Sequence, residues 1–177
     1  TYMVQLANSS TVRYAQLFDI SKSNPVFCNR GTSGIDGSTS TAVGAAMQYK
    51  APTLLISGDL SFLYDINGLW NNYLRPDLRI VVMNNGGGGI FRILPGKEES
   101  PEFEKYFETP QNQSIQSICM AYGLEYREAK DEDSLKHQLS TFYEPSGSPI
   151  LLNIYTPRKL NDKILLGYFE FLSSDKS

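Results

Sequence analysis

Short apolar runs alternate with longer helix-like stretches along the chain, and this alternation predicts strands separated by helices. The runs that predict strands lie at 3–7, 25–29, 52–57, 79–84, 123–129 and 149–155. The stretches that predict helices lie at about 10–18, 38–49, 61–73, 112–122 and 132–143. The runs TLLIS, IVVM and ILLNI are nearly continuous in Val, Ile and Leu, as is typical of parallel strands covered on both faces. The pattern therefore predicts an α/β doubly wound, mostly parallel sheet of about six strands, with helices on both faces.

Helix ends and the end of the chain carry further signals. Gly123 follows the fourth predicted helix, as a glycine just past a helix C-terminus should, and Asp131 or Asp133 can cap the fifth. After Tyr155 the chain is polar and then aromatic, with GYFEFL at 167–172. This tail predicts either a docking helix or a further strand.

Composition narrows the class of protein. The 177 residues are predicted to form a single domain, 1–177, with a tail at 158–177, and 41% hydrophobic with 20% charged residues is typical of a globular protein. The net charge is −3 and the basic residues are scattered, which argues against nucleic acid as a partner. No apolar run approaches the ~20 residues of a membrane span. Cys28 and Cys119 fit neither a disulfide framework nor a zinc site, so we expect a reducing cytoplasm. Because the chain opens on Thr1, we expect an excised fragment.

Candidate chemistry lies in the strand-to-helix turns, because ligands of doubly wound sheets bind outside the carboxyl ends of the strands. The turn at 29–46, NRGTSGIDGSTSTAVGAA, is rich in glycine and hydroxyl residues. Asp59 lies in SGDLS at the end of a buried strand, where a carboxylate is costly unless it is paired, hydrogen-bonded or bound to a metal. The next strand ends in NNGGGG at 84–89.

Together these turns offer the groups that a metal-bound diphosphate needs. Phosphate binds free N–H groups and helix N-termini, and magnesium prefers hard oxygen ligands that include phosphate oxygens. We therefore predict that Asp59, the side-chain oxygen of Asn85 and a carbonyl of the glycine loop hold a divalent ion against a diphosphate.

Each signal also has a simpler interpretation when it stands alone. A run of glycines is most often a linker, Asp59 can be a helix cap, and RGTSGIDG can be a tight turn. The sequence carries neither a Walker A motif nor a G-x-G-x-x-G fingerprint after its first strand. The lone histidine, His137, falls within a predicted helix and is expected at the surface, which argues against a Ser-His-Asp or Cys-His catalytic set.

The spacing of the motifs resembles that of the thiamine-diphosphate enzymes. GD at 58–59 is followed by 24 residues and then NN at 84–85, which is similar to the family's GDG, twenty-odd residues and NN. Leu60 departs from this pattern in place of the second glycine. That departure and the stretches CNRGTSGIDGSTSTAVG, GDLSFLYDINGLW and NNGGGGIFRILPG resemble one branch of the family, the synthases of bacterial menaquinone biosynthesis. The resemblance extends over about 8–155.

The resemblance implies a site for thiamine diphosphate and Mg²⁺ (or Mn²⁺). The metal ligands that it implies are the side chains of Asp59 and Asn85 and the carbonyl of Gly87. The residues implied to line the diphosphate are Gly58, Leu60, Ser61, Gly87, Gly88 and Gly89. Those implied to lie beside the thiazolium and pyrimidine rings are Ser33, Gly34 and Ile35, and Ile35 is the bulky residue over which the cofactor bends.

The resemblance also implies a substrate region. Its carboxylate-binding residues are Ser9, Arg13 and Arg30, and its apolar wall is Ile90, Phe91 and Leu94. The implied substrates, 2-oxoglutarate and isochorismate, are polyanions, and the guanidinium fork of arginine suits carboxylates. Gly89 stands where a glutamine-like side chain is expected, so we expect backbone contacts from this position in place of side-chain contacts.

The implied reaction is the decarboxylation of 2-oxoglutarate and the addition of the resulting succinyl carbanion to isochorismate. In this family the glutamate that activates the cofactor lies on a separate pyrimidine-binding domain of a partner subunit, and nothing in the 177 residues corresponds to it. We therefore expect the C-terminal, diphosphate-binding part of a cytoplasmic homodimer or homotetramer, with negligible synthase activity alone.

Three other interpretations stay open. The corresponding domain of an acetolactate synthase or benzoylformate decarboxylase would carry GDG at 58–60 and would lack the arginines of NSSTVR and NRG. A flavodoxin-like module would bind FMN or a dinucleotide without magnesium. A dimerisation domain with a decayed site would not need to keep Asp59, Asn85 and both arginines.

Overall fold

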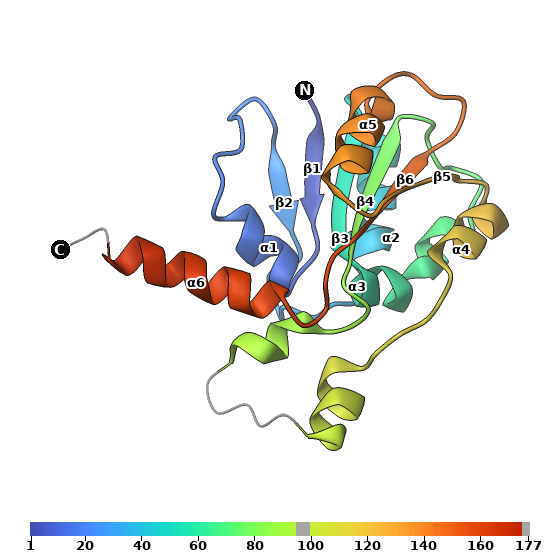
Figure 1. Cartoon of the computed structure of the whole chain (residues 1–177). Helices are drawn as coiled ribbons and strands as arrows, with labels where there is room; N and C mark the ends of the chain where they lie inside the picture. The colour runs from blue at the N-terminus through green and yellow to red at the C-terminus, as the bar shows by residue number, and fades with distance from the viewer. Residues whose placement is uncertain (95–99, 175–177) are drawn as a thin grey trace.

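The computed structural model describes residues 1–94 and 100–174. Its centre is a sheet of six parallel strands in the order β2-β1-β3-β4-β6-β5 (Figure 1). The strands are β1 (Met3–Leu6), β2 (Val26–Cys28), β3 (Thr53–Gly58), β4 (Leu78–Asn84), β5 (Glu125–Ala129) and β6 (Ile150–Tyr155). They coincide closely with the predicted runs, so the doubly wound α/β fold is confirmed.

Helices cover both faces of the sheet. The α-helices are α1 (Ser10–Ala15), α2 (Ser38–Gln48), α3 (Asp59–Tyr64), α4 (Ile115–Tyr122), α5 (Glu132–Phe142) and α6 (Asn161–Ser174). The 3₁₀-helices η1 (Ile66–Leu69) and η2 (Gly89–Ile93) and the π-helix η3 (Phe103–Glu108) complete the set within 1–94 and 100–174.

Successive side chains along the strands point to opposite faces of the sheet and pack into two separate cores. Leu55 of β3 packs in the core that α2 and α4 share, whereas its neighbour Leu54 packs in the core beneath α5. A third cluster joins Val4 and Leu6 of β1 to Val12 of α1. The strands are apolar on both sides because each face of the sheet is covered.

The predicted helix at 61–73 has the wrong bounds. The α-helix occupies Asp59–Tyr64, and a separate 3₁₀-helix follows at Ile66–Leu69. Asp65 lies at the break, where its carboxylate accepts a hydrogen bond of 2.6 Å from the backbone N–H of Ser40 in α2. The backbone at Gly68 also lies against Ser40, since a Cβ at Gly68 would be 2.8 Å from the Ser40 Cα. Contact with α2 therefore ends the helix earlier than its own sequence indicates.

Local signals at the other helix ends are confirmed. Gly123 has φ 72° and follows α4 in the left-handed conformation. Asp131 caps α5 in a capping box, accepting from the Ser134 N–H at 2.7 Å while its own N–H donates to Ser134 Oγ at 3.1 Å. The tail forms α6, which is the helical one of the two predicted alternatives and extends away from the sheet (Figure 1). The last three residues of the predicted tail lie outside the described residues, as do Pro95 and Gly96 at the end of the stretch NNGGGGIFRILPG.

The lone histidine and the two cysteines lie in ordinary surroundings. His137 is exposed, as predicted, and Cys28 and Cys119 are free thiols. Within the described residues no helix combines the length and apolar character that a membrane crossing requires.

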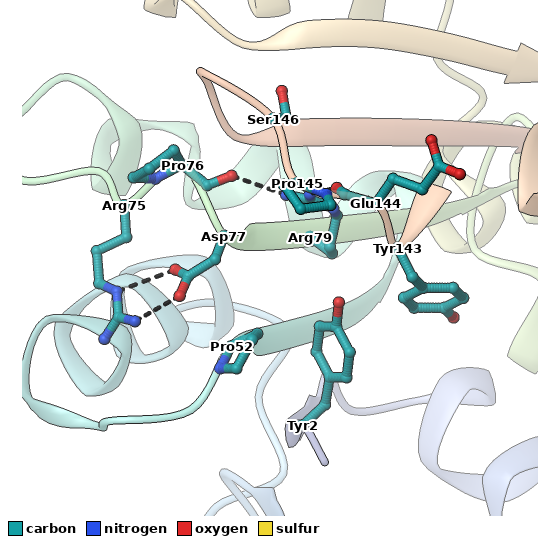
Figure 2. Close-up of a pocket in the computed structure, with 10 residues that line it drawn as sticks. All are labelled: Tyr2, Pro52, Arg75, Pro76, Asp77, Arg79, Tyr143, Glu144, Pro145 and Ser146. Atoms are coloured by element: carbon teal, nitrogen blue, oxygen red, sulfur yellow. Dashed lines mark hydrogen bonds and ion pairs between the residues drawn. The ribbon is translucent and has the colours of Figure 1, made fainter. Parts of the chain in front are cut away.

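A buried arginine supports the edge of the sheet at which the strands begin. A cavity of about 350 Å³ lies here. Figure 2 shows residues that line it, among them the Arg75–Asp77 ion pair and Arg79. Arg79 is 2% exposed, and its guanidinium donates to the carbonyls of Phe142 at 2.6 Å and Glu144 at 2.5 Å. A buried cation thus caps the C-terminus of α5, where carbonyl groups lack helical partners.

Candidate functional site

A cavity of about 750 Å³ lies at the opposite, carboxyl edge of the sheet. Here the strand order reverses, because the chain passes from β1 to β2 and then returns to β3 on the other side of β1. The predicted site residues that line the cavity are Ser9, Arg13, Arg30, Ser33, Ile35, Gly58, Asp59, Leu60, Ser61, Asn85, Gly87, Gly88, Gly89, Ile90 and Phe91. Gly34 and Leu94 lie outside this lining, and Ile93 contributes to it.

Asp59 is the buried carboxylate of the site, with 2% of its surface exposed. Its Oδ2 accepts a hydrogen bond of 2.8 Å from Nε2 of Gln111. Burial raises the pKa of Asp59, and hydrogen bonds from Gln111 and from backbone N–H groups, including that of Gly87, oppose this rise. A cation bound beside Asp59 would favour the charged carboxylate and offset the unfavourable effect of burial.

The two asparagines at the end of β4 have different surroundings. Asn84 is buried, and its Oδ1 accepts from the N–H of Gly86 at 3.2 Å and from Gln111 Nε2 at 3.4 Å. Asn85 instead lines the cavity, and its Oδ1 accepts from the N–H of Gly87 at 3.3 Å. Asn84 therefore supports the glycine loop from the protein side, whereas Asn85 faces the space that a ligand would enter.

Close contact with the backbone at 107–109 shapes the glycine loop. Gly87 has φ 155°, and a Cβ there would lie 2.7 Å from the carbonyl oxygen of Glu108. The N–H of Gly88 donates to that same oxygen at 2.6 Å. Glycine suits position 87 because a Cβ would collide with this backbone oxygen, and because L side chains rarely adopt such a φ. The glycines thus serve packing as well as any phosphate contact.

Gly89, the position where a larger side chain was expected, has a local explanation. A Cβ at Gly89 would lie 2.5 Å from Nδ2 of Asn85. The amide group of Asn85 therefore occupies the space that a side chain at position 89 would enter.

Ser61 and Asp65 hold the loop at 33–35 and the start of α2, respectively. Ser61 of α3 donates from Oγ to the carbonyl of Ile35 at 2.6 Å. Asp65 accepts from Oγ of Ser40 at 2.8 Å, in addition to the backbone bond described above, and so fixes the first turn of α2. Ser61, predicted as a diphosphate contact, thus also fastens the segment that carries Ile35.

Arg13 and Arg30 lie on the exposed side of the cavity lining. Nη1 of Arg30 donates to Oδ1 of Asn8 at 3.0 Å. Neither arginine takes part in the ion pairs found among the described residues. Two guanidinium groups without a carboxylate partner in this part of the chain suit an anionic ligand.

The apolar wall belongs to η2, and a buried ion-pair cluster fixes this helix. Arg92 of η2 is 2% exposed and donates from Nη2 to Oε2 of Glu108 at 2.8 Å. Arg158, which follows β6, donates to the same oxygen at 2.7 Å. Glu104 lies 3.3 Å from the Arg158 guanidinium and extends the cluster. The cluster thus joins η2, η3 and the segment before α6.

Sequence reasoning missed three residues that hold the site together. Asn8 lies two residues after the end of β1, and a polar residue close behind a strand is the kind of signal that singled out Asp59. Gln111 and Glu108 carry no local signal, because their partners are remote in sequence.

The available donors fit a hard divalent cation held together with a phosphate. The described residues contain no group of three or more His, Cys, Asp and Glu side chains that could hold a metal. The cavity offers instead the carboxylate of Asp59, the amide oxygen of Asn85 and backbone carbonyls. Magnesium accepts such a small oxygen set because phosphate oxygens and water complete its octahedron.

Fold and site together define the class of α/β domains whose site lies at the carboxyl edge of a parallel sheet. The family described as thiamine pyrophosphate enzyme, C-terminal TPP binding domain, matches residues 8–154, and the chain belongs to this family. This membership excludes the flavodoxin-like alternative and supports thiamine diphosphate as the cofactor.

Curated relatives resemble the chain over nearly all of its length. It is 54% identical over 172 residues to the 2-succinyl-5-enolpyruvyl-6-hydroxy-3-cyclohexene-1-carboxylate synthase of Christiangramia forsetii, covering 97% of this chain and 30% of that protein. Synthases of the same name from Flavobacterium psychrophilum and Bacteroides fragilis are 52% and 41% identical, covering 96% and 97% of this chain and 31% of each relative. The chain thus spans less than a third of the length of these relatives.

Proposed function

We propose that the chain is the diphosphate- and Mg²⁺-binding part of a thiamine-diphosphate-dependent transferase of menaquinone biosynthesis. This enzyme decarboxylates 2-oxoglutarate and adds the succinyl unit to isochorismate. The observation that carries the proposal is the buried carboxylate of Asp59 in one cavity with Asn85 and Gly87. The family match supports the cofactor, and the names of the relatives support the reaction.

Each part of the cavity has a role in this proposal. Asp59, Asn85 and the carbonyl of Gly87 would hold Mg²⁺ (or Mn²⁺), and the backbone at Gly58 and Gly88 would lie along the diphosphate. Thiamine diphosphate, when bound, supplies stabilisation of the negative charge that decarboxylation of a 2-oxo acid develops. The loop at 33–35 would support the cofactor rings.

The substrate side uses charge and apolar surface. Ser9, Arg13 and Arg30 would bind the carboxylates of 2-oxoglutarate and isochorismate. Ile90 and Phe91 would exclude water from the reacting carbon atoms. Ile93 fits this wall better than Leu94, because Ile93 lines the cavity.

The greater length of the relatives supports further parts of the proposal. A pyrimidine-binding domain of a partner subunit would complete the site in a cytoplasmic homodimer or homotetramer. The chain alone would then be inactive, because the described residues that line the cavity include no glutamate.

Turnover of 2-oxoglutarate and isochorismate tests the proposal, measured on the protein at its natural length. Asp59→Asn keeps the shape of the side chain and removes its charge, and we expect activity to fall by more than about a hundredfold at limiting Mg²⁺. The matched control is Asp77→Asn at the opposite edge of the sheet, which should keep wild-type turnover. Full activity of Asp59→Asn under these conditions would contradict the proposal.

A further inference from the structure

Both the nitrogen and the oxygen of the Asn8 side-chain amide form hydrogen bonds, at the point where the strand order reverses. It follows β1 and is 2% exposed. Nδ2 donates to the carbonyl oxygens of Asn29 and Gly34, each at 2.6 Å. Oδ1 accepts from Nη1 of Arg30 at 3.0 Å and from Sγ of Cys28 at 3.4 Å.

These partners fix the orientation of the Asn8 amide and require an amide. Carbonyl oxygens can only accept, so the NH₂ group must face Asn29 and Gly34. A guanidinium can only donate, so the oxygen must face Arg30. Aspartate would offer no donors to the carbonyls, and serine would supply one polar atom in place of two.

The position of Asn8 connects the two predicted halves of the site. Arg30 belongs to the substrate side, whereas Gly34 lies between Ser33 and Ile35, which line the cofactor side. The next residue, Ser9, has φ 65° and also lines the cavity. A non-glycine residue in this conformation persists only where its surroundings hold it, as at many functional sites.

We propose that Asn8 is a positioning residue that couples the substrate-binding guanidinium of Arg30 to the cofactor-supporting segment at 33–35. Loss of the amide frees both groups together, so anion binding and cofactor binding depend on one side chain. The identity of the two ligands rests on the proposed function, whereas the tie between Asn8 and the loop does not.

A double-mutant cycle distinguishes coupling from general destabilisation, using the protein at its natural length. Asn8→Ala should raise the Kd for thiamine diphosphate and the KM for each substrate by about tenfold, the size expected from losing a hydrogen bond to a charged group. In an Arg30→Ala background, the effect of Asn8→Ala on KM should disappear while its effect on the cofactor Kd persists. A merely structural role would leave both effects unchanged by Arg30→Ala.

Cys28 gives a second measurement that needs no ligand. Its thiol donates to Asn8, so Asn8→Ala should accelerate iodoacetamide labelling of Cys28 by about tenfold, quantified on the Cys28 peptide by mass spectrometry. Cys119 is fully buried, and burial raises its pKa to about 12, so it serves as the unreactive internal reference. The matched control is Asn24→Ala, whose Oδ1 accepts from the N–H of Tyr2 at 2.9 Å, before the start of β1.

The outcomes separate this inference from the proposed function. Labelling of Cys28 at the wild-type rate in Asn8→Ala would overturn the positioning role, whatever the protein binds. Faster labelling in a protein that binds no thiamine diphosphate would contradict the proposed function alone. If Asn8→Ala loses its native circular dichroism spectrum, Asn8→Ser replaces it, and unchanged labelling and Kd in that variant would overturn the inference.

Discussion

Glu108→Gln is expected to weaken the fold strongly, because it leaves two arginines facing a neutral side chain. Glu108 is 1% exposed, and its Oε2 accepts from Arg92 at 2.8 Å and from Arg158 at 2.7 Å. Glutamine has nearly the same shape as glutamate, so the substitution removes charge with little change in packing. The experiment therefore measures the charge interaction itself.

The expected magnitude follows from burial and from the neighbouring acid. Breaking a buried ion pair by removing one partner costs about 3–5 kcal/mol. Glu104 lies 3.3 Å from Arg158 and 3.7 Å from Arg92, and its side chain is 39% exposed. Because Glu104 partly compensates both arginines, we expect a loss near the lower end, about 3 kcal/mol.

Urea-induced unfolding, followed by circular dichroism, measures this loss as a change in the free energy of unfolding. The matched control is Glu132→Gln, because Glu132 pairs with Lys136 at the surface, where its side chain is 79% exposed. The control should differ from wild type by no more than experimental error, since exposed pairs contribute little. A loss below about 1 kcal/mol for Glu108→Gln would refute the claim that the buried cluster fixes η2.

Three further predictions concern other parts of the structure. Gly87→Ala should destabilise the fold by about 2–3 kcal/mol in urea unfolding, because residue 87 has a positive φ and the new Cβ would lie 2.7 Å from a backbone oxygen. The control Gly147→Ala should cause no such loss, because there is open space around Gly147. Arg79→Met should cost about 2–4 kcal/mol in the same assay, because the carbonyls of Phe142 and Glu144 lose their donor, and a change below about 1 kcal/mol would contradict the capping role. Burial raises the pKa of Asp59 in the folded chain above its value in the unfolded chain. The metal-free fold should therefore be most stable below the unfolded-state pKa and should lose stability as the pH rises through the folded-state pKa. Stabilisation by Mg²⁺ with thiamine diphosphate, which needs the carboxylate, should grow over that same window in thermal unfolding, and a pH-independent shift would contradict the assignment.

The sheet could be predicted from sequence because its signal is local. The runs around Leu55 and Ile80 are apolar on both sides, and both faces of the sheet are covered. The carboxyl ends of parallel strands meet at one edge of the sheet, so the sequence alone predicts that Asp59 and Asn85 lie close together.

The elements that escaped prediction are those set by contacts between distant segments. The helix at 61–73 divides at Asp65 because this residue binds Ser40, which lies 25 positions away. The π-helix η3 ends at Glu108, whose partners Arg92 and Arg158 lie 16 and 50 positions away. No window of local sequence contains such pairs, so periodicity and capping signals could not find them.

The candidate site shows the same division. Motif spacing pointed to the family, and the resemblance implied most of the residues discussed as lining the cavity. It implied neither Asn8 nor Gln111, which hold such residues in place. The resemblance to a known family supplied roles for Arg13 and Arg30 that composition alone leaves undefined. The supporting residues became visible only with their hydrogen bonds.

Calorimetric titration with thiamine diphosphate tests the central claim most directly, using the protein at its natural length in Mg²⁺ and in EDTA. We predict binding in Mg²⁺ that is lost in EDTA and lost again in Asp59→Asn with Mg²⁺ restored, while Asp77→Asn binds as wild type does. Binding of equal affinity in EDTA, or in Asp59→Asn, would contradict a metal-held diphosphate at the carboxyl edge of the sheet.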